Sequence, residues 1–318
     1  MAGLAHYDGL DRFAGTAGRS IHLAIGMFDG VHRGHRKVIE SAIGAAAEAG
    51  GLAGALTFWP HPSVLFQPEN PTPMILDPKT KRSELEKLRI DFMIEEPFTK
   101  VFAATESNRF VAMLKDKIPE LASIHTGQNW RFGKGRLGDV ALLKALADAE
   151  GVDFAAMECL YVEGERVSST RVRNALSSGR IEEANRLLGY EYDSLGTVTE
   201  GKKVGRTIDA PTLNLPFEGD LAPCYGVYAV RVSRFDGDER LPGVANFGIR
   251  PTVNELKRPL LEAHVLGECP FGYGDRLRVE WIAFLRPEMK FDGIGALRAR
   301  IAMDIEEARR LFQDSIDG

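Results

Sequence analysis

The sequence has few cysteines, no excess of basic residues and no long apolar run. Its three cysteines lie far apart and include no CxxC pair, which disfavours a disulfide framework and a structural zinc site. No apolar run approaches the about 18 residues of a membrane-spanning helix, and the N-terminus lacks the pattern of a signal peptide. With a net charge of −5, the chain also lacks the concentrated basic face that nucleic-acid backbones require. We therefore expect a cytoplasmic protein with neither nucleic acid nor a membrane as its partner.

The composition that remains is that of an ordinary globular protein with room for two domains. The chain has 318 residues, of which 44% are hydrophobic and 27% are charged, enough for two apolar cores. Short basic clusters occur at residues 79–82 and 202–206. A solvated face or a small anionic ligand accounts for clusters this short better than nucleic acid does.

The first part of the chain, from residue 20 to about 160, alternates strand-like apolar runs with amphipathic helical patterns. This alternation predicts a parallel sheet with helices on both faces, whose ligands bind beyond the carboxyl ends of the strands. The predicted strands are 21–25, 51–58, 91–95, 122–126 and 152–159, and the predicted helices are 36–50, 106–118, 139–150, 168–179 and 181–189. The proline-rich residues 68–78 are predicted to form a loop.

After about residue 190 the pattern changes to short β-rich segments with turn signals and no helices between them. Such a series favours a β-barrel or a sandwich. An apolar stripe over residues 293–315 predicts a terminal helix that packs on it. The predicted strands are 196–199, 225–235, 244–247, 260–266 and 277–284. We place the two domains at residues 1–187 and 188–318.

A glycine-punctuated turn, Gly26 to His35, joins the first predicted strand to the first predicted helix. Backbone N–H groups at a helix N-terminus favour anions. Two histidines three residues apart would place two imidazoles at this same helix N-terminus. A single histidine is more often a polar surface residue, but His-x-Gly-His is expected only about 0.02 times by chance in this composition. The candidate ligand-binding residues of the turn are Gly26, Phe28, Asp29, His32, Gly34 and His35.

A second polar cluster stands at the beginning of the predicted helix 168–179. It combines three hydroxyl side chains with arginines, whose guanidinium groups can hold phosphate oxygens in a bidentate manner. Helix capping with solvent-facing arginines would explain any one of these residues alone. Their combination downstream of the two histidines favours a phosphate site. The candidates are Arg166, Ser168, Ser169, Thr170 and Arg173.

The histidine motif resembles the His-x-Gly-His signature of nucleotidylyltransferases, and residues 28–32, Phe-Asp-Gly-Val-His, resemble their flavin-adenylating branch. Two further segments are similar to that branch: Thr-Phe-Trp-Pro-His-Pro at 57–62 and Gly-Gln-Asn-Trp-Arg-Phe-Gly at 127–133. The hydroxyl and arginine cluster resembles the second motif of the same family. The resemblance implies a Rossmann-like nucleotidyltransferase domain that transfers the adenylyl group of ATP to FMN.

The resemblance also implies a role for each candidate in this domain. His32 and His35 would donate to the α- and β-phosphate oxygens of ATP, Arg173 would hold the pyrophosphate, and Mg²⁺ would neutralise charge. The flavin would contact Phe58, Asn129 and Phe132, since aromatic rings and an amide suit an isoalloxazine. Taken singly, these aromatic residues would more often belong to the core.

The second domain carries a glycine-rich basic run followed by Pro-Thr-Leu-Asn at 211–214, and Leu-Glu-Ala-His at 261–264. These segments resemble a riboflavin kinase module, which implies a six-stranded barrel that phosphorylates riboflavin with ATP. By this resemblance Thr212 and Asn214 would bind Mg²⁺ with the nucleotide, and Glu262 would act as general base. Taken singly, Glu262 would be a surface strand residue and Asn214 a turn residue. The residues implied to cradle phosphates are Gly201, Lys202, Gly205 and Arg206.

The kinase motif departs from the usual family pattern, and this leaves alternatives open. Where that family usually reads Gly-Phe-Pro-Thr-Ala-Asn, this chain reads Asp209-Ala-Pro-Thr-Leu-Asn214. The sequence as a whole resembles the family of bifunctional riboflavin kinase/FMN adenylyltransferases, the prokaryotic FAD synthetases. A monofunctional FMN adenylyltransferase with a degenerate flavin-binding barrel is the first alternative, and a non-catalytic flavin or nucleotide sensor is the second.

Overall fold

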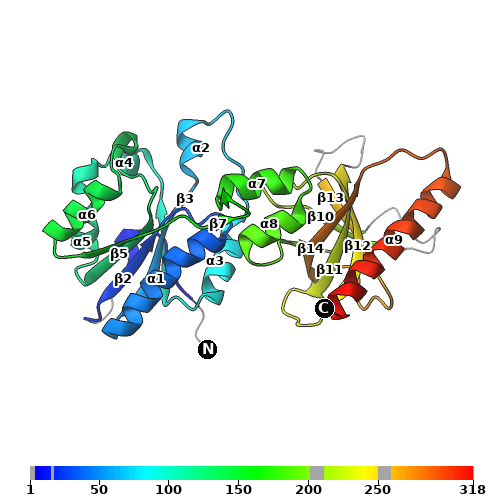
Figure 1. Ribbon diagram of the computed structural model, residues 1–318, viewed down its shortest axis with the longest axis horizontal. Coiled ribbons are helices and arrows are strands. Elements are labelled where there is room, and N and C mark those ends of the chain that lie inside the picture. The colour runs from blue at the N-terminus through cyan, green and yellow to red at the C-terminus, as the bar shows by residue number, and fades with distance from the viewer. Residues whose placement is uncertain (1–3, 16–17, 201–210, 250–258, 318) are drawn as a thin grey trace. The chain divides into compact units, whose positions relative to one another are not determined.

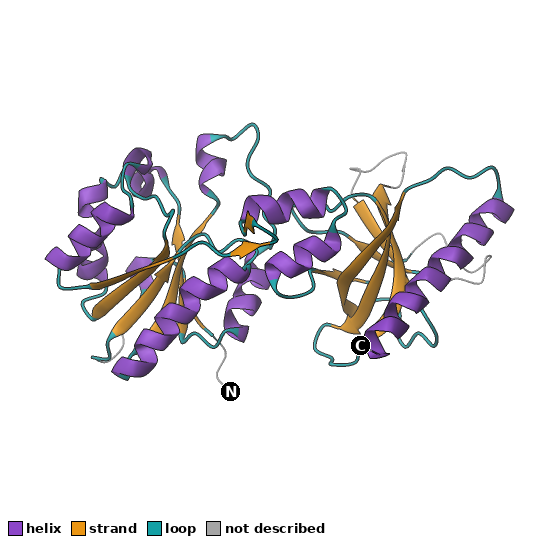
Figure 2. Ribbon diagram, in the orientation of Figure 1, coloured by secondary structure: helices purple, strands orange, loops and turns teal. Residues whose placement is uncertain are grey.

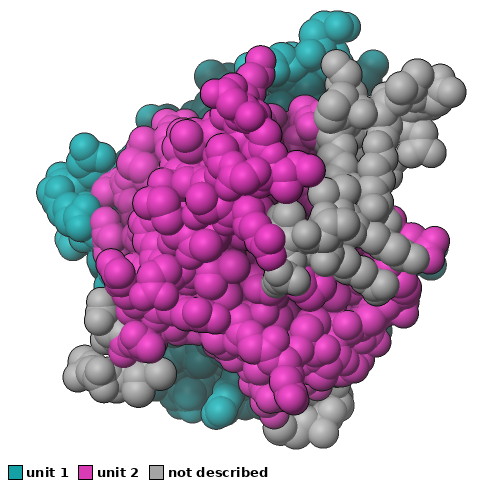
Figure 3. All heavy atoms as spheres, turned by 90° about the vertical axis from the view of Figure 1, so that its right-hand side faces the viewer, with its two compact units in different colours: residues 1–169 teal, residues 170–318 magenta. Residues whose placement is uncertain are grey.

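The computed structural model describes residues 4–15, 18–200, 211–249 and 259–317. The chain divides into two compact units, residues 1–169 and 170–318, which Figure 3 shows in different colours. The division between the compact units falls after residue 169, whereas the predicted domain boundary lies between residues 187 and 188 and stays a prediction.

The first unit is built around a six-stranded, wholly parallel sheet, as the strand and helix alternation predicts (Figures 1 and 2). The strand order is β1-β4-β3-β2-β5-β6. The bounds are β1 Ala5–Tyr7, β2 Ile21–Ile25, β3 Leu52–Trp59, β4 Phe92–Pro97, β5 Leu121–Gly127 and β6 Asp153–Met157. A two-stranded antiparallel ribbon follows, with β7 Tyr161–Val162 and β8 Glu165–Arg166. The short edge strand β1 was not predicted.

The strand order reverses at β2, and this fixes where a ligand can bind. From β2 the chain continues to β3 and β4 on one side, and later to β5 and β6 on the other. In open parallel sheets the crevice at such a reversal, beyond the carboxyl ends of the strands, is the usual ligand site. The segments that leave β2 at Ile25 and β5 at Gly127 both begin at this edge.

The helices of the first unit agree with the prediction where the apolar periodicity is strong. Helix α1 begins at Arg33 rather than at Arg36, because the His32 side chain accepts from the His35 N–H and caps the helix. The predicted helix 106–118 is a 3₁₀ turn followed by α5. Helix α3 and the short helices α2 and α4 were not predicted. The bounds are α1 Arg33–Ala49, α2 Pro62–Phe66, α3 Pro78–Lys87, α4 Lys100–Ala103, α5 Phe110–Lys117 and α6 Val140–Ala149; α7 Ser169–Ser177 begins at the last residue of this unit.

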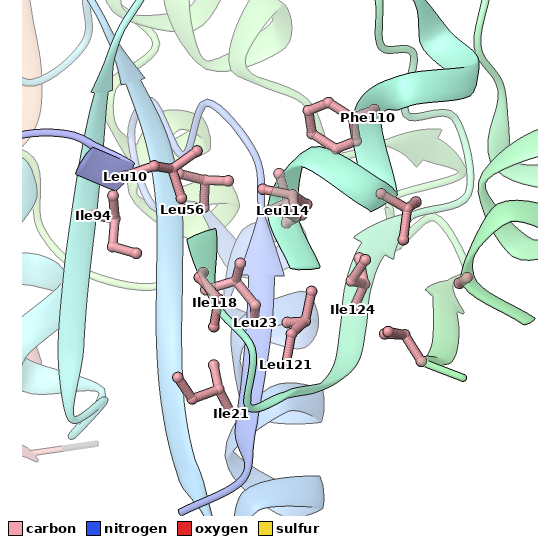
Figure 4. Close-up of a cluster of buried hydrophobic side chains, with 14 of the residues drawn as sticks. Leu10, Ile21, Leu23, Leu56, Ile94, Phe110, Leu114, Ile118, Leu121 and Ile124 are labelled. Carbon is pink, nitrogen blue, oxygen red and sulfur yellow. The ribbon is translucent and has the colours of Figure 1, made fainter. Parts of the chain in front are cut away.

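One apolar core fills the space between the sheet and helices α5 and α6 (Figure 4). Phe110, Leu114 and Ile118 recur at helical spacing on and just after α5, and Figure 4 shows them on the same side of the sheet as Leu23 and Ile124. Each fully buried side chain of this size contributes about 1.5–3 kcal/mol to folding. This core anchors the strands whose carboxyl ends carry the site.

The opposite face of the central strands carries a buried chain of polar side chains under α1. His22 Nδ1 lies 2.7 Å from Ser123 Oγ, which lies 2.7 Å from His125 Nε2, and His125 Nδ1 lies 2.8 Å from Ser41 Oγ of α1. Because His22 alternates with Ile21 and Leu23, it points away from the apolar core. Burial, and next the charge of His22, lower the pKa of His125 to about 4, although Asp153 opposes this.

Acid is expected to destabilise the first unit through His125. The unfolded chain takes up this proton near pH 6.5, whereas the folded protein does so only near pH 4. Since the unfolded state binds more protons in between, the free energy of unfolding should fall by about 2–3 kcal/mol between pH 7 and pH 4.5. Urea unfolding at several pH values measures this loss. The H125Q variant should lose less, and an equal loss in both proteins would contradict the assignment.

The second unit is a six-stranded antiparallel barrel with a terminal helix, as the kinase resemblance implies. The strand order is β10-β13-β12-β11-β14-β9, and a bridge from Thr199 N to Asn214 O, 2.8 Å long, joins the two ends of this order. The rings of Tyr228, Phe247 and Trp281 pack edge to face in the interior. The bounds are β9 Asp193–Thr197, β10 Leu213–Pro216, β11 Gly226–Arg234, β12 Leu241–Ile249, β13 Pro259–Val265, β14 Arg276–Pro287, α8 Ile181–Leu188 and α9 Ile294–Asp317.

Helix α9 lies against the outside of the barrel (Figure 1). Ala308 of the helix is buried against Val227 and Ala229 of β11. A buried ion pair adds to this contact: Arg286 of β14 donates through Nε and Nη2 to the carboxylate of Asp304, at 2.8–3.0 Å. Helix α9 thus packs on the barrel through its apolar stripe, as the sequence predicts.

Candidate active sites

The two histidines of the His-x-Gly-His motif lie together at the N-terminus of α1, directly beyond the end of β2. Their rings stack, with centroids 3.6 Å apart and an interplanar angle of 16°. His32 Nδ1 accepts from the His35 backbone N–H at 3.2 Å. A neutral His32 therefore carries its proton on Nε2, which makes this atom a donor. The arrangement combines a directed imidazole N–H with the positive end of a helix dipole.

The two glycines predicted in this turn have steric reasons to be glycines. A Cβ on Gly26 would come within 2.9 Å of the buried Phe28 ring, and a Cβ on Gly34 would come within 3.2 Å of the His32 ring. The Phe28 ring in turn meets the edge of the His35 ring, with centroids 5.4 Å apart. Gly26, Phe28 and Gly34 therefore determine how the imidazoles lie.

The loop between β2 and α1 has a strained backbone. Phe28 and Val31 have φ values of +49° and +36°, and Gly30 has +82°. A positive φ at a residue with a Cβ costs about 1–3 kcal/mol and persists only where the surroundings impose it. One such restraint is Asp29, whose buried carboxylate accepts from Ile75 N at 3.0 and 3.1 Å and from Leu76 N at 3.2 Å. Strain of this kind is common at functional sites.

The hydroxyl cluster reaches the same loop through its second serine. Ser169, the first residue of α7, donates from Oγ to the Asp29 backbone oxygen at 2.9 Å. Ser168 is half-buried directly before it, and Arg166 is exposed in β8. Thr170 and Arg173 follow on α7 in the second unit, where Thr170 is exposed and Arg173 is half-buried. Ser169 of the first unit thus contacts the loop that carries the histidines.

The predicted flavin contacts lie at the carboxyl end of β3 (Phe58) and on the segment that follows β5 (Asn129 and Phe132), but the two rings are buried. Phe58 packs against Phe102 and Phe98, and Phe132 is stacked on Trp130 at an interplanar angle of 10°. Asn129 lies on the loop after β5 and donates from Nδ2 to Cys159 Sγ at 3.0 Å. Asn129 and Trp130 are the more accessible members of this set.

The predicted kinase residues meet in one row across the barrel. In the strand register, Asn214 of β10 is opposite Glu262 of β13, and Glu262 is opposite Asn246 of β12. Residues directly opposite in antiparallel strands have their Cβ atoms about 4.5–5.5 Å apart on the same face. Their neighbours Leu213 and Ala263 are buried toward the interior, so the row lies on the outer face. Asn246 was not singled out from the sequence, because nothing local shows the register.

The motif departure at Leu213 is explained by this alternation. Leu213 is opposite Ala263 in the register, on the face away from Asn214 and Glu262. A leucine in place of the family's alanine therefore changes barrel packing rather than the polar row. Strand β10 also shows that Asn214 belongs to a strand rather than to a turn. The predicted phosphate-cradling residues Gly201, Lys202, Gly205 and Arg206, and also Asp209, lie outside the described residues.

The residues around Asn214 fit a magnesium-nucleotide site. The Oδ1 atom of Asn214 is buried and has no hydrogen-bond partner within the part of the chain that the structure describes. An amide oxygen in this state is a suitable ligand for Mg²⁺, which keeps much of its coordination for water and phosphate. The half-buried Thr212 lies two residues before it. No cluster of three or more histidine, cysteine, aspartate or glutamate residues that could hold a metal occurs within the described ranges.

The described part of the chain contains no helix that is both long and apolar enough to cross a membrane. Cys159, Cys224 and Cys269 are free.

Comparisons with known proteins agree for both halves of the chain. Family models described as FAD synthetase and riboflavin kinase match residues 16–171 and 188–312. The bifunctional riboflavin kinase/FMN adenylyltransferase of Escherichia coli strain K12 is 34% identical over 91% of this chain and 92% of its own length. That of Bacillus subtilis is 35% identical and covers 92% of both chains.

A solved structure extends the likeness to the whole fold. A crystal structure described as a macrolide-efflux protein from Streptococcus pneumoniae has a TM-score of 0.86 and 26% identity, and covers 97% of this chain and 99% of that one. The two family models and the higher identity to the bifunctional enzymes decide the family. This chain belongs to the family of bifunctional riboflavin kinase/FMN adenylyltransferases.

Proposed function

We propose that this chain makes FAD from riboflavin in two ATP-dependent steps. Residues 188–318 transfer the γ-phosphoryl group of ATP to riboflavin, giving FMN and ADP, and residues 1–187 transfer the adenylyl group of ATP to FMN, giving FAD and pyrophosphate. The family membership of both halves supports both steps. The observation that carries the second step is the stacked pair His32 and His35 at the N-terminus of α1.

In the adenylyl transfer, a phosphate oxygen of FMN attacks the α-phosphorus of ATP while the bond to the pyrophosphate oxygen breaks. No protein nucleophile is needed, because the reaction depends on positioning and on stabilising the developing negative charge. His32 Nε2 and the His35 imidazole donate to the α- and β-phosphate oxygens. Ser168, Ser169 and Thr170 with the first turn of α7, together with Arg166 and Arg173, hold the departing pyrophosphate.

The FMN acceptor is placed by the segments that end β3 and β5. The Asn129 amide pairs with a polar edge of the isoalloxazine, and Phe58 and Phe132 support the aromatic side of its site. Because the Phe58 and Phe132 rings are buried, we assign them to the wall of the flavin site, together with the more accessible Trp130. The loop residues Gly26, Phe28, Asp29 and Gly34 hold the histidines in place.

In the kinase step, the 5′-hydroxyl oxygen of riboflavin attacks the γ-phosphorus of ATP and ADP leaves. Glu262 accepts the hydroxyl proton, and the side chains of Thr212 and Asn214 would hold Mg²⁺ with the nucleotide. When bound, Mg²⁺ would neutralise phosphate charge. The strand register that places Asn214 opposite Glu262 supports a common site for metal and base. Gly201, Lys202, Gly205 and Arg206 complete the phosphate cradle.

The family comparison favours this proposal over the two alternatives. The monofunctional alternative was suggested by the altered kinase motif. However, the riboflavin kinase model matches residues 188–312, and the altered residue Leu213 points into the barrel. A non-catalytic sensor would not require Glu262 in register with Asn214. The free cysteines support a cytoplasmic location.

A product assay with the whole chain tests the proposal. Riboflavin, ATP and Mg²⁺ should yield FMN, then FAD, with ADP and pyrophosphate formed in the same amounts as the respective products. Chelating Mg²⁺ should abolish both conversions. FAD from FMN but no FMN from riboflavin would establish the monofunctional alternative. No pyrophosphate from FMN and ATP would contradict the proposal and leave the sensor alternative standing.

A further inference from the structure

A buried lysine on α3 lies beneath the strained loop between β2 and α1. The side chain of Lys81 is only 1% exposed, and its Nζ atom lies 3.2 Å from Glu95 Oε1 of β4 and 3.2 Å from Thr57 Oγ1 of β3. The basic cluster 79–82 was expected to form a solvated face or to bind a small anion, and for Lys81 a solvated position is wrong. Its ammonium group is instead buried beside Thr57 and Glu95, near the carboxyl ends of β3 and β4.

Lys81 is connected to the loop by a hydrogen-bond relay with a fixed direction. An ammonium group can only donate, so Lys81 Nζ donates to Thr57 Oγ1. Thr57 then donates its hydroxyl proton to the Met27 backbone oxygen at 3.0 Å. Because the peptide is planar and trans, holding the Met27 carbonyl oxygen also directs the Phe28 N–H to the opposite side. The relay therefore sets the peptide next to the first strained residue.

Helix α3 holds the other end of the same loop through a second ion pair. Glu84 Oε2 accepts from Arg36 Nη2 at 3.1 Å, and Arg36 Nε donates to the Val31 backbone oxygen at 3.1 Å. Lys81 and Glu84 are three residues apart and thus lie on the same face of α3. Both are buried. One helix face thereby restrains residues 27 and 31, on either side of the loop that leads to His32.

We propose that Lys81 is a positioning residue for adenylyl transfer: through Thr57 it holds the Met27–Phe28 peptide, and with it the histidine pair, in the reactive arrangement. This inference rests on the proposed function of the first domain. Stability alone does not account for the ammonium group, because a buried ion pair can often be replaced by apolar side chains without loss of stability. A displacement of about 1 Å at a reacting centre can slow a reaction about 100-fold.

The T57V variant tests the relay without removing a charge. It keeps the shape of the side chain and the pair of Lys81 with Glu95, but it cannot donate to Met27. K81M removes the start of the relay, and K81R retains a donor. K144M is the matched control, because Lys144 pairs with Asp148 on the exposed surface of α6 in the same unit. The whole chain is assayed for FAD and pyrophosphate formation from FMN and ATP, and for FMN formation from riboflavin.

We expect T57V and K81M each to lower kcat for FAD formation by about 10- to 100-fold, with KM for FMN and ATP changed less than threefold. The double variant should be no slower than the slower single variant, since both substitutions break one relay. K81R should recover part of the rate, while K144M should retain the parent rate. FMN formation from riboflavin should stay at the parent rate in all variants, which shows that the second unit is folded. The nearly unchanged KM values for FMN and ATP show that the first unit is folded as well.

Two results would overturn the positioning role. One is a T57V protein that forms FAD within twofold of the parent rate. The other is a double variant in which the two losses multiply, which would make them independent effects on stability. If K81M does not fold, T57V alone decides. Failure of the proposed function would look different, because the parent chain itself would then release no pyrophosphate from FMN and ATP.

Discussion

The H32N variant is expected to lower kcat/KM for FAD formation by about 100- to 1,000-fold, the usual cost of removing one preorganised donor to a developing anion. Asparagine is chosen because His32 also caps α1, accepting from the His35 N–H. Asparagine is among the best capping residues, so it keeps the helix start while it removes the Nε2 donor. The measurement is pyrophosphate release with saturating ATP and varied FMN.

The matched control for H32N is H6N, which makes the same histidine-to-asparagine substitution on the edge strand β1. It should retain the parent rate of FAD formation. FMN formation from riboflavin should be unchanged in both variants, because the predicted kinase residues belong to the other domain. A fully active H32N protein would show that His32 serves only as a cap, and a loss of both activities in a folded protein would contradict separate sites.

The E262Q variant should show the reverse pattern. Loss of a general base typically slows a reaction about 10²- to 10⁴-fold, so FMN formation from riboflavin should fall by that factor. Glutamine keeps the size of the side chain and its place opposite Asn214 and Asn246 in the register. FAD formation from supplied FMN should continue at the parent rate. The measurement is FMN and ADP formed from riboflavin and ATP.

The exposed Glu268, in the same unit just after β13, provides the control E268Q, which should be fully active. A mixture of H32N and E262Q proteins should make FAD from riboflavin, because FMN released by one variant can be used by the other. An E262Q protein with the parent rate of FMN formation would eliminate Glu262 as the base. A mixture that produces no FAD would show that FMN does not pass between molecules.

Sequence patterns predicted those elements whose burial follows a simple period. Strand β2 is apolar enough to stand out as a short run, and α6 and α9 carry regular apolar stripes. Helix α3 was missed because its buried face is largely polar and includes Lys81 and Glu84, so no apolar period marks it. Strand β10 was missed because it spans only four residues and ends in a proline.

The candidate sites divide in the same way. The His-x-Gly-His spacing and the hydroxyl cluster are local, so their residues can be named from the amino-acid sequence alone. Contacts between distant segments cannot be predicted in this way. Lys81 contacts Thr57 and through it Met27, and Asn246 becomes a neighbour of Glu262 through strand pairing. A hydrogen bond between residues far apart in the chain leaves no periodic or spacing signal in the sequence.

By itself, the sequence determined the α/β character of the first half, the β character of the second, the terminal helix and the two histidines at a strand-to-helix turn. These follow from local propensity, periodicity and motif spacing. The tertiary structure decided the strand order, the closure of the barrel, the inward direction of Leu213 and the buried position of Lys81. These depend on which distant segments pair and on which face each side chain then occupies. The histidine turn is thus encoded locally, whereas the lysine that supports it is defined only by the fold.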